Sequence, residues 1–187
     1  MRVLGISGSL RRDSHNTALL RAAAALLPPG AELELWEGLK AVPPYDADDD
    51  AALVRPRAVR ELDAAIRGAD AVLIATPEYN HSIPGVLKNA IDWASRPKAD
   101  AALKNKPVAV IGTSTGMFGA VWAQAETRKA LAGAGARVLD RELPVASADE
   151  QFHPLDGRLV DKDVETELGG ILLELVAEAQ PVLQRAS

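Results

Sequence analysis

Apolar and polar positions change along the chain in a way that predicts five strands. Short, continuous apolar runs indicate strands buried on both faces, and alternation of apolar and polar side chains indicates a half-buried strand. The run ADAVLIAT, at 69–76, is apolar almost throughout, so we expect it at the centre of the sheet. The predicted strands lie at 3–6, 32–36, 69–76, 106–113 and 136–140.

Helical spacing of apolar residues separates these runs. Asp161 or Asp163 is a candidate cap for the last helix, although Gly169 and Gly170 lower its intrinsic helix propensity. Its apolar side carries Ile171, Leu172, Leu175, Val176 and Ala179. The earlier helices are expected at 16–27, 57–67, 86–95 and 120–132, and loops at 40–56 and 144–161.

Strands that alternate with helices predict an α/β fold, in which a parallel sheet is covered on both faces. We find no internal repeat or linker, so residues 1–187 are expected to form a single domain. Right-handed crossovers favour a flavodoxin-like three-layer sandwich whose five-stranded parallel sheet has the order 2-1-3-4-5. Ligands bind such sheets beyond the carboxyl ends of the strands, so the loops after strands one, three and four are the candidate site.

The first loop, 7–17, has the donors that a phosphate monoester needs. The positive end of a helix supplies free N–H groups, and the loop adds hydroxyls, an amide and a cation. It lacks the glycines of a dinucleotide fingerprint and the G-K-[ST] of a triphosphate loop. The alternative is a plain turn in which Ser14 only caps the helix. The candidate donors are Ser9, Ser14, Thr17, Asn16, and Arg11 or Arg12.

The second loop opens the stretch TPEYNHSIPGVLKNAIDW, at 76–93, and its two prolines restrict its flexibility. Such a loop can present backbone amides to a flat ligand. Glu78 with His81 suggests general acid–base catalysis, or His81 a metal ligand. No H-E-x-x-H pattern is present, so we reject a metal site. Tyr79 could instead be a packed aromatic, and Lys88 with Asp92 an exposed ion pair on a helix.

The third loop, GTSTGMFGA at 112–120, follows strand four. Its small side chains permit a planar ring to approach the backbone, although they also suit an ordinary tight turn. Candidate serine nucleophiles are Ser7, Ser9 and Ser114, but the sequence has no G-x-S-x-G elbow and no evident histidine–acid pair, which argues against a hydrolase.

Composition narrows the chemistry further. The chain has no cysteine, which excludes disulfides and thiolate chemistry, so redox activity would need a bound cofactor. A net charge of -5 argues against nucleic acid as a partner. The chain has no apolar run long enough to span a membrane and opens on a strand-like run, so we expect a cytoplasmic protein. The acidic cluster within 46–50 is interpreted as a solvated connection rather than a metal site.

Three stretches together closely resemble the NADPH-dependent FMN reductase family, which includes flavin, quinone, chromate and azo-dye reductases. The stretches are GSLRRDSHNTALLR, PEYNHSIPGVLKNAIDW and GTSTGMFGA, in this order, and the middle one is the specific motif. The resemblance covers roughly residues 1–132, and DGRLVDKD before the last helix is also similar.

The resemblance implies an FMN-dependent enzyme with NADPH or NADH as the electron donor and a small molecule as the acceptor. It implies ping-pong hydride transfer at the flavin N5, for which no catalytic side chain and no metal is assigned. The FMN phosphate would be bound by Ser9, Arg11, Ser14, Asn16 and Thr17. The isoalloxazine would be lined by Pro77, Glu78, Tyr79 and Asn80, largely through main-chain groups, with Ser114 and Gly116 at its pyrimidine side.

The resemblance also implies a homodimer or homotetramer, with the helix that begins near Pro84 and carries Trp93 as a contact surface. Some relatives have an arginine where this chain has Trp122, in a region that can support subunit packing or acceptor binding. The alternative is a flavodoxin-type FMN electron carrier without NADPH turnover, although its T-x-T-G-x-T loop is absent here. A non-redox phosphate-binding domain is a third possibility.

Overall fold

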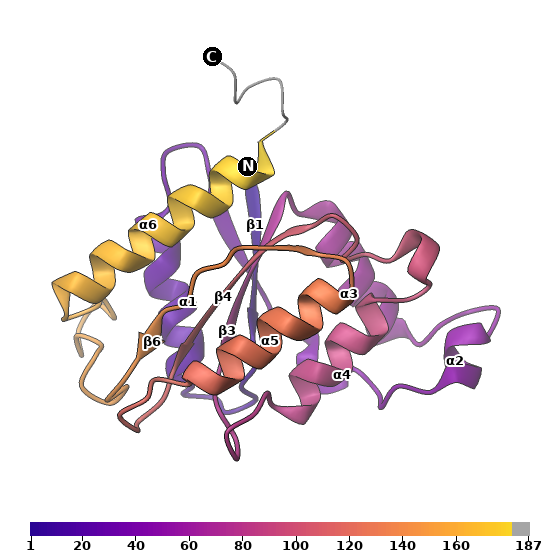
Figure 1. Cartoon of the computed structure of the whole chain (residues 1–187), viewed down its shortest axis with the longest axis horizontal. Helices are drawn as coiled ribbons and strands as arrows, with labels where there is room; N and C mark the ends of the chain where they lie inside the picture. The colour runs from indigo at the N-terminus through magenta and orange to yellow at the C-terminus, as the bar shows by residue number, and fades with distance from the viewer. Residues whose placement is uncertain (181–187) are drawn as a thin grey trace.

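The computed structural model describes residues 1–180 and is built on one parallel sheet (Figure 1). The strand order is β2-β1-β3-β4-β5, with β6 also paired to β4, so the flavodoxin-like order predicted from the sequence is confirmed. Every strand pair is parallel. The strands are β1 (Arg2–Ser7), β2 (Glu32–Trp36), β3 (Ala71–Thr76), β4 (Pro107–Thr113), β5 (Arg137–Val138) and β6 (Pro144–Val145).

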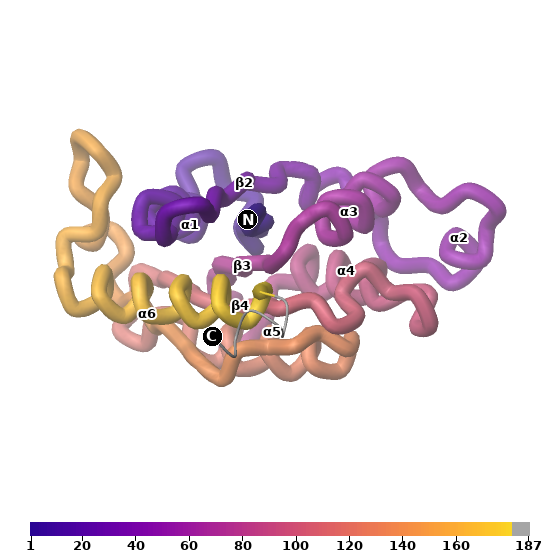
Figure 2. The backbone as a smooth tube through the Cα atoms, turned by 90° about the horizontal axis from the view of Figure 1, so that it is seen from above, coloured from indigo at the N-terminus to yellow at the C-terminus, as the bar shows by residue number. Residues whose placement is uncertain are grey.

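Helices cover both faces of the sheet, as Figure 2 shows end-on. The helices α1 (His15–Leu26) and α6 (Lys162–Ala179) pack on one face. On the other face lie α3 (Arg57–Gly68), α4 (Gly85–Ala94) and α5 (Val121–Gly133). Shorter helical turns are η1 (Gly38–Ala41), α2 (Ala47–Ala51) and η2 (Lys98–Asp100). Within residues 1–180 no helix is long and apolar enough to cross a membrane.

The central strand β3 is buried along its whole length, as its apolar run predicts. Successive side chains point to opposite faces, so Leu73 packs towards α1 and α6 whereas Ile74 packs towards α3 and α4. Burial of each such side chain contributes roughly 1.5–3 kcal/mol. The carboxyl ends of β1, β3 and β4 are therefore held side by side, which brings the three candidate loops to one edge of the sheet.

The fifth strand differs from the expected 136–140, because only Arg137–Val138 form β5. The chain then leaves the sheet and pairs with β4 again as β6, inside the region 144–161 that was expected to be loop. The buried amide of Gln124 contacts the chain just before β6 begins. It accepts a hydrogen bond from the Leu143 N–H at 2.9 Å and donates to the Leu143 carbonyl at 3.1 Å.

The region 40–56, also expected to be loop, contains part of η1 and all of α2. Asp46 begins α2, because its carboxylate accepts the Asp48 N–H at 2.7 Å. Asp50 forms an ion pair with Arg55 at 3.0 Å. Two members of the acidic cluster are therefore used in local structure, one in capping and one in an ion pair.

The last helix continues through Gly169 and Gly170. Of the two candidate caps, Asp161 is the one used, since its carboxylate accepts the N–H groups of Asp163 and Val164. Packing outweighs the low propensity of the glycines, because Leu168, Ile171, Leu172 and Leu175 on this helix are all fully buried.

Candidate active site

The three loops predicted from the sequence line one cavity of about 210 Å³ at the carboxyl edge of the sheet. The first loop precedes α1, the second joins β3 to α4, and the third joins β4 to α5. The lining residues are Ser9, Arg11, Ser14, His15, Asn16, Pro77, Glu78, Tyr79, Thr113, Ser114 and Thr115.

Three of the predicted site residues, Thr17, Asn80 and Gly116, lie outside this lining. The Thr17 hydroxyl instead donates to the Ser7 hydroxyl at 3.0 Å. Three further residues line the cavity although the sequence did not predict them. These are His15, Thr113 and Thr115, each of which stands next to a predicted residue in the same motif.

Helix α1 points its N-terminus at the cavity. Ser14 caps this helix, since its hydroxyl accepts the Thr17 N–H at 3.4 Å, as the capping alternative predicted. Among the described residues, the N–H groups of His15 and Asn16 have no acceptor. Free N–H groups at a helix N-terminus form a site for an anion, and Arg11 adds a positive charge at its edge.

Asn16 joins the first loop to the end of β4. Its amide nitrogen donates to the Thr113 carbonyl at 3.0 Å, and its amide oxygen accepts the Thr113 N–H at 3.1 Å. Both residues are buried. The side chain of Asn16 is thus occupied, and its main-chain N–H is the donor that stays available to a ligand.

The second loop is a tight turn. Tyr79 and Ser82 exchange two main-chain hydrogen bonds of 3.1 Å, and the two residues between them have left-handed backbones, with φ of 53° at Asn80 and 59° at His81. This is the geometry of a type I′ turn, for which asparagine is a favoured residue. The turn leaves Tyr79 53% exposed at the mouth of the cavity rather than packed in the interior.

Glu78 connects this turn to α5. One carboxylate oxygen accepts the N–H groups of Trp122 and Ala123, both at 3.1 Å. These are first-turn amides of α5, whose own cap residue, Ala120, has no side chain that can accept them. Glu78 therefore caps a helix 44 residues away, with its negative charge at the positive end of the helix dipole.

Two further contacts reinforce the connection to α5. The His81 ring packs edge-on against Trp122 at 4.8 Å, and the Ser82 hydroxyl donates to the Glu126 carboxylate. His81 also lies 3.5 Å from the other oxygen of Glu78, but its side chain is 77% exposed. Among the described residues, no group of three or more His, Cys, Asp or Glu side chains could hold a metal ion.

The third loop is held against β6. The Thr113 hydroxyl and the Ser114 N–H both donate to the Val145 carbonyl, at 2.9 and 3.1 Å. At Gly112 an added Cβ would lie 2.7 Å from the Thr76 carbonyl oxygen, so the close approach of β3 and β4 requires glycine there. This glycine therefore sets the spacing of the two strands that carry the second and third loops.

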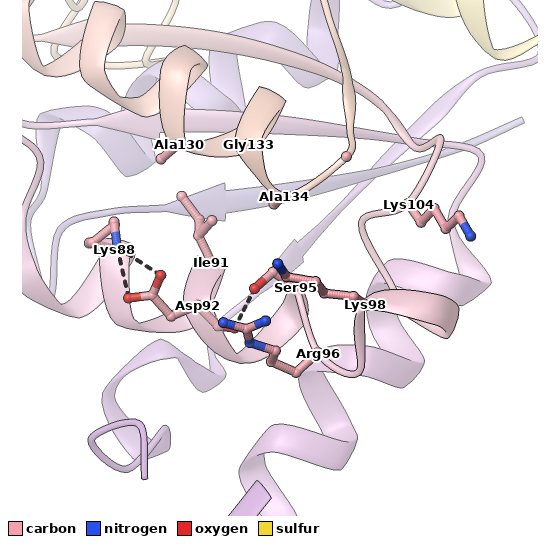
Figure 3. Close-up of a pocket in the computed structure, with 11 residues that line it drawn as sticks. Lys88, Ile91, Asp92, Ser95, Arg96, Lys98, Lys104, Ala130, Gly133 and Ala134 are labelled. Carbon is pink, nitrogen blue, oxygen red and sulfur yellow. Dashed lines mark hydrogen bonds and ion pairs between the residues drawn. The ribbon is translucent and has the colours of Figure 1, made fainter. Parts of the chain in front are cut away.

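A larger cavity of about 470 Å³ lies between α4 and α5, away from the three loops (Figure 3). Lys88 and Asp92 on its wall form the predicted ion pair at 2.7 Å. Farther along it are Arg96, Lys98 and Lys104, near the amino end of β4. Since ligands of such sheets bind at the opposite edge, this larger cavity is not the candidate active site.

The prediction for Trp93 as part of a subunit contact is wrong. Its side chain is fully buried within this chain, where it packs edge-on against Tyr45 at 4.9 Å. Its indole N–H donates to the Pro43 carbonyl at 2.8 Å, and Arg55 lies over the ring. The indole is therefore part of the core that anchors the segment before α2.

Comparisons with known proteins agree with the geometry. The family described as NADPH-dependent FMN reductase matches residues 1–150. An NAD(P)H-dependent FMN reductase of Pseudomonas aeruginosa is 46% identical over 162 residues, which are 86% of this chain and 85% of that one. A quinone reductase of Escherichia coli strain K12 is 35% identical over 173 residues, 92% of each chain.

Among solved structures, the flavoenzyme NAD(P)H:(acceptor) oxidoreductase FerB of Paracoccus denitrificans superposes with a TM-score of 0.81. It is 37% identical, and the match covers 95% of this chain and 96% of that one. The fold and the sequence therefore lead to the same group of reductases.

Proposed function

This chain belongs to the NADPH-dependent FMN reductase family, and we propose that its three-loop cavity holds FMN for a ping-pong reduction of small acceptors. The family establishes an oxidoreductase enzyme that uses FMN and NAD(P)H. The proposal adds where the cofactor lies, how the two substrates alternate, and which acceptors are used. One FMN-binding domain formed by residues 1–187 and a cytoplasmic location stay predictions.

The donor set of the cavity fits FMN. The phosphate would lie at the N-terminus of α1, where the N–H groups of His15 and Asn16 are free and Arg11 is close by. Ser9 and Ser14 present hydroxyls on the same side. This convergence of donors on one cavity is the observation that carries the proposal, because a single phosphate monoester would satisfy all of them.

The isoalloxazine would lie between the second and third loops. The type I′ turn at 79–82 and the small residues around Ser114 present main-chain groups to it. Glu78 keeps the second loop fixed against α5, so these groups are held in position before the cofactor binds. When bound, FMN supplies the hydride chemistry by accepting a hydride from NAD(P)H and passing the electrons to the acceptor.

Quinones are the acceptors that the relatives support most directly, since one of the enzymes named above is a quinone reductase. Flavin, chromate and azo compounds are also acceptors within the proposal. The cavity mouth is rimmed by the exposed ring of Tyr79, and Phe118 and Trp122 are exposed close to the same loops. Apolar rings at the mouth suit a flat aromatic acceptor.

We include a homodimer or homotetramer in the proposal. Met117, Phe118 and Trp122 are 77%, 55% and 39% exposed, and Phe118 packs edge-on against Trp122 at 4.9 Å. A second copy over these side chains would remove apolar surface from water and complete the wall of the cavity. Sedimentation analysis at several protein concentrations tests this part separately from catalysis.

The decisive experiment is an absorbance spectrum of the purified protein after incubation with FMN, followed by anaerobic titration with NADPH. We expect a yellow protein whose flavin absorbance is bleached by NADPH and restored by a quinone added afterwards. Initial rates at several fixed quinone concentrations should give parallel double-reciprocal lines. Failure to retain FMN would overturn the site, and intersecting lines would overturn the ping-pong order. An electron carrier would bind FMN without oxidising NADPH.

A further inference from the structure

A second groove, of about 380 Å³, adjoins the proposed FMN cavity. It lies between the first loop and the carboxyl end of β2, and it shares Ser9 and Arg11 with the FMN cavity. None of the proposed FMN contacts on the second and third loops reaches it. The remaining lining residues are Ser7, Leu10, Arg12, Thr17, Arg21, Leu35, Trp36, Glu37, Leu39 and Lys40.

Positive charge is concentrated in this groove, although the chain as a whole has a net charge of -5. The side chains of Arg12, Arg21 and Lys40 form no hydrogen bond or ion pair with any of the residues that the structure describes. By contrast, Arg2 at the other end of the sheet is paired with Glu34 at 2.7 Å. Glu37 is the single acidic residue of the lining.

The floor of the groove is apolar and includes an indole ring. Trp36 is half-buried, and an added Cβ at Gly38 would lie 2.5 Å from the Cζ2 atom of its ring. Glycine at 38 therefore permits the ring to lie against the backbone of η1. Leu35 and Leu39 complete the floor. Unpaired cations around an aromatic and aliphatic floor suit a ligand with a phosphate and a flat ring.

We propose that this groove binds the 2′-phosphate-bearing adenosine end of NADPH and so makes the enzyme prefer NADPH over NADH. NADPH differs from NADH only in this 2′-phosphate monoester. Its negative charge favours binding next to cations, which NADH would not need. The N-terminus of α1 is taken by the FMN phosphate, so the second monoester requires a site of its own. This inference rests on the proposed function, since it assumes that the nicotinamide reaches FMN in the adjoining cavity.

The test uses a double variant, Arg21→Gln with Lys40→Gln, in the FMN-loaded enzyme. Both side chains lie in the groove and outside the FMN cavity. We expect kcat/KM for NADPH to fall about tenfold or more, mainly through KM, because two charge-assisted contacts are lost. With NADH, kcat/KM should change less than twofold. The matched control is Arg96→Gln, which removes an arginine that also has no ion-pair partner among the described residues but lies in the distant 470 Å³ cavity. It should change kcat/KM for neither NADPH nor NADH.

Equal losses with NADPH and NADH, or an unchanged preference, would overturn the proposal. A loss of FMN affinity in the double variant would also overturn it, because the groove would then serve the FMN phosphate. Calorimetric titration with 2′-AMP and 5′-AMP gives a readout that does not depend on turnover. The parent protein should bind 2′-AMP more tightly, and the double variant should lose that difference. If FMN is not retained at all, the proposed function fails, yet this titration still decides whether the groove recognises a 2′-phosphate.

Discussion

Gly119 lies so close to Pro144 that an added Cβ would be 2.3 Å from the Pro144 carbonyl carbon. Its backbone is also left-handed, with φ of 55°. Both constraints arise where the third loop passes over β6 before α5 begins. A side chain at this position would force apart the two segments that support the third loop of the cavity.

Gly119→Ala should lower the free energy of unfolding by roughly 2–4 kcal/mol, from backbone strain together with the clash. Urea denaturation followed by circular dichroism measures the change. The control is Gly169→Ala in α6, where an added Cβ meets nothing within 4 Å. Alanine should stabilise that helix by roughly 0.5–1 kcal/mol. If the two substitutions changed the free energy of unfolding by similar amounts, the backbone at Pro144 would have to move away from the new side chain at little cost.

Asn16→Ala should destabilise the fold by roughly 2–3 kcal/mol, because it leaves the buried N–H and C=O of Thr113 without their partner. Asn16→Asp keeps an acceptor for the N–H but places a carboxylate against the Thr113 carbonyl. Burial and this repulsion would raise the pKa of the new carboxyl above its ordinary value.

The folded Asn16→Asp variant would then bind more protons than its unfolded chain at mildly acidic pH. Its stability relative to Asn16→Ala should therefore rise as the pH falls from 7 towards about 4. Urea midpoints at a series of pH values measure this difference. A difference that does not vary with pH would mean that the carboxyl has left the contact with Thr113.

The strand pattern was sufficient to predict the sheet because buried parallel strands are read directly from apolar runs such as β3. The break between β5 and β6 was not predictable in this way. Just before β6, the chain is held at Leu143 by the side chain of Gln124, which lies on α5, 19 residues away in the sequence. Trp93 shows the same limit, since no local pattern reveals that Tyr45 covers it.

The candidate site was predicted at the level of loops, because the carboxyl edge of a parallel sheet gathers the loops that follow its strands. The roles of single side chains inside the loops depend on partners far along the chain. Asn16 reads as a free donor in the sequence, yet Thr113, 97 residues away, uses both ends of its amide. His15 was not predicted because the helix was expected to begin at Asn16, whereas α1 begins at His15 and brings its N–H to the cavity.

Asp156 gives a prediction for pH. The hydrogen bonds from Arg158 hold the pKa of this carboxyl at about 2, below its ordinary value of 3.8. The contact therefore stabilises the loop before α6 fully above about pH 4 and is lost as the pH falls towards 2. Carboxyl carbon shifts in an NMR titration report the midpoint. Arg158→Gln should return it towards the ordinary value, and an unchanged midpoint would assign the shift to another neighbour.

Glu78→Ala tests whether the cap on α5 also shapes the FMN cavity. Loss of the carboxylate leaves the N–H groups of Trp122 and Ala123 without their acceptor and removes a favourable charge from the helix N-terminus. We expect a loss of roughly 1–2 kcal/mol in stability, with Glu78→Gln intermediate because its oxygen still accepts a hydrogen bond. Since the same residue fixes the second loop, the Kd for FMN should rise in the same order, from parent to Gln to Ala.

The matched control is Glu126→Gln. It removes one negative charge, as the Glu78 variants do, but from a residue on α5 that does not cap the helix, and glutamine still offers an acceptor for the Ser82 hydroxyl. It should alter neither the urea midpoint nor FMN binding appreciably. Flavin fluorescence quenching measures the Kd, and urea unfolding of the FMN-free protein measures the cap alone. If Glu78→Ala loses stability while its Kd for FMN matches the parent, the cap supports only the helix. A parallel loss in both measurements means that the second loop depends on α5 for its binding geometry, and that an interaction 44 residues apart in sequence orders the cavity before FMN arrives.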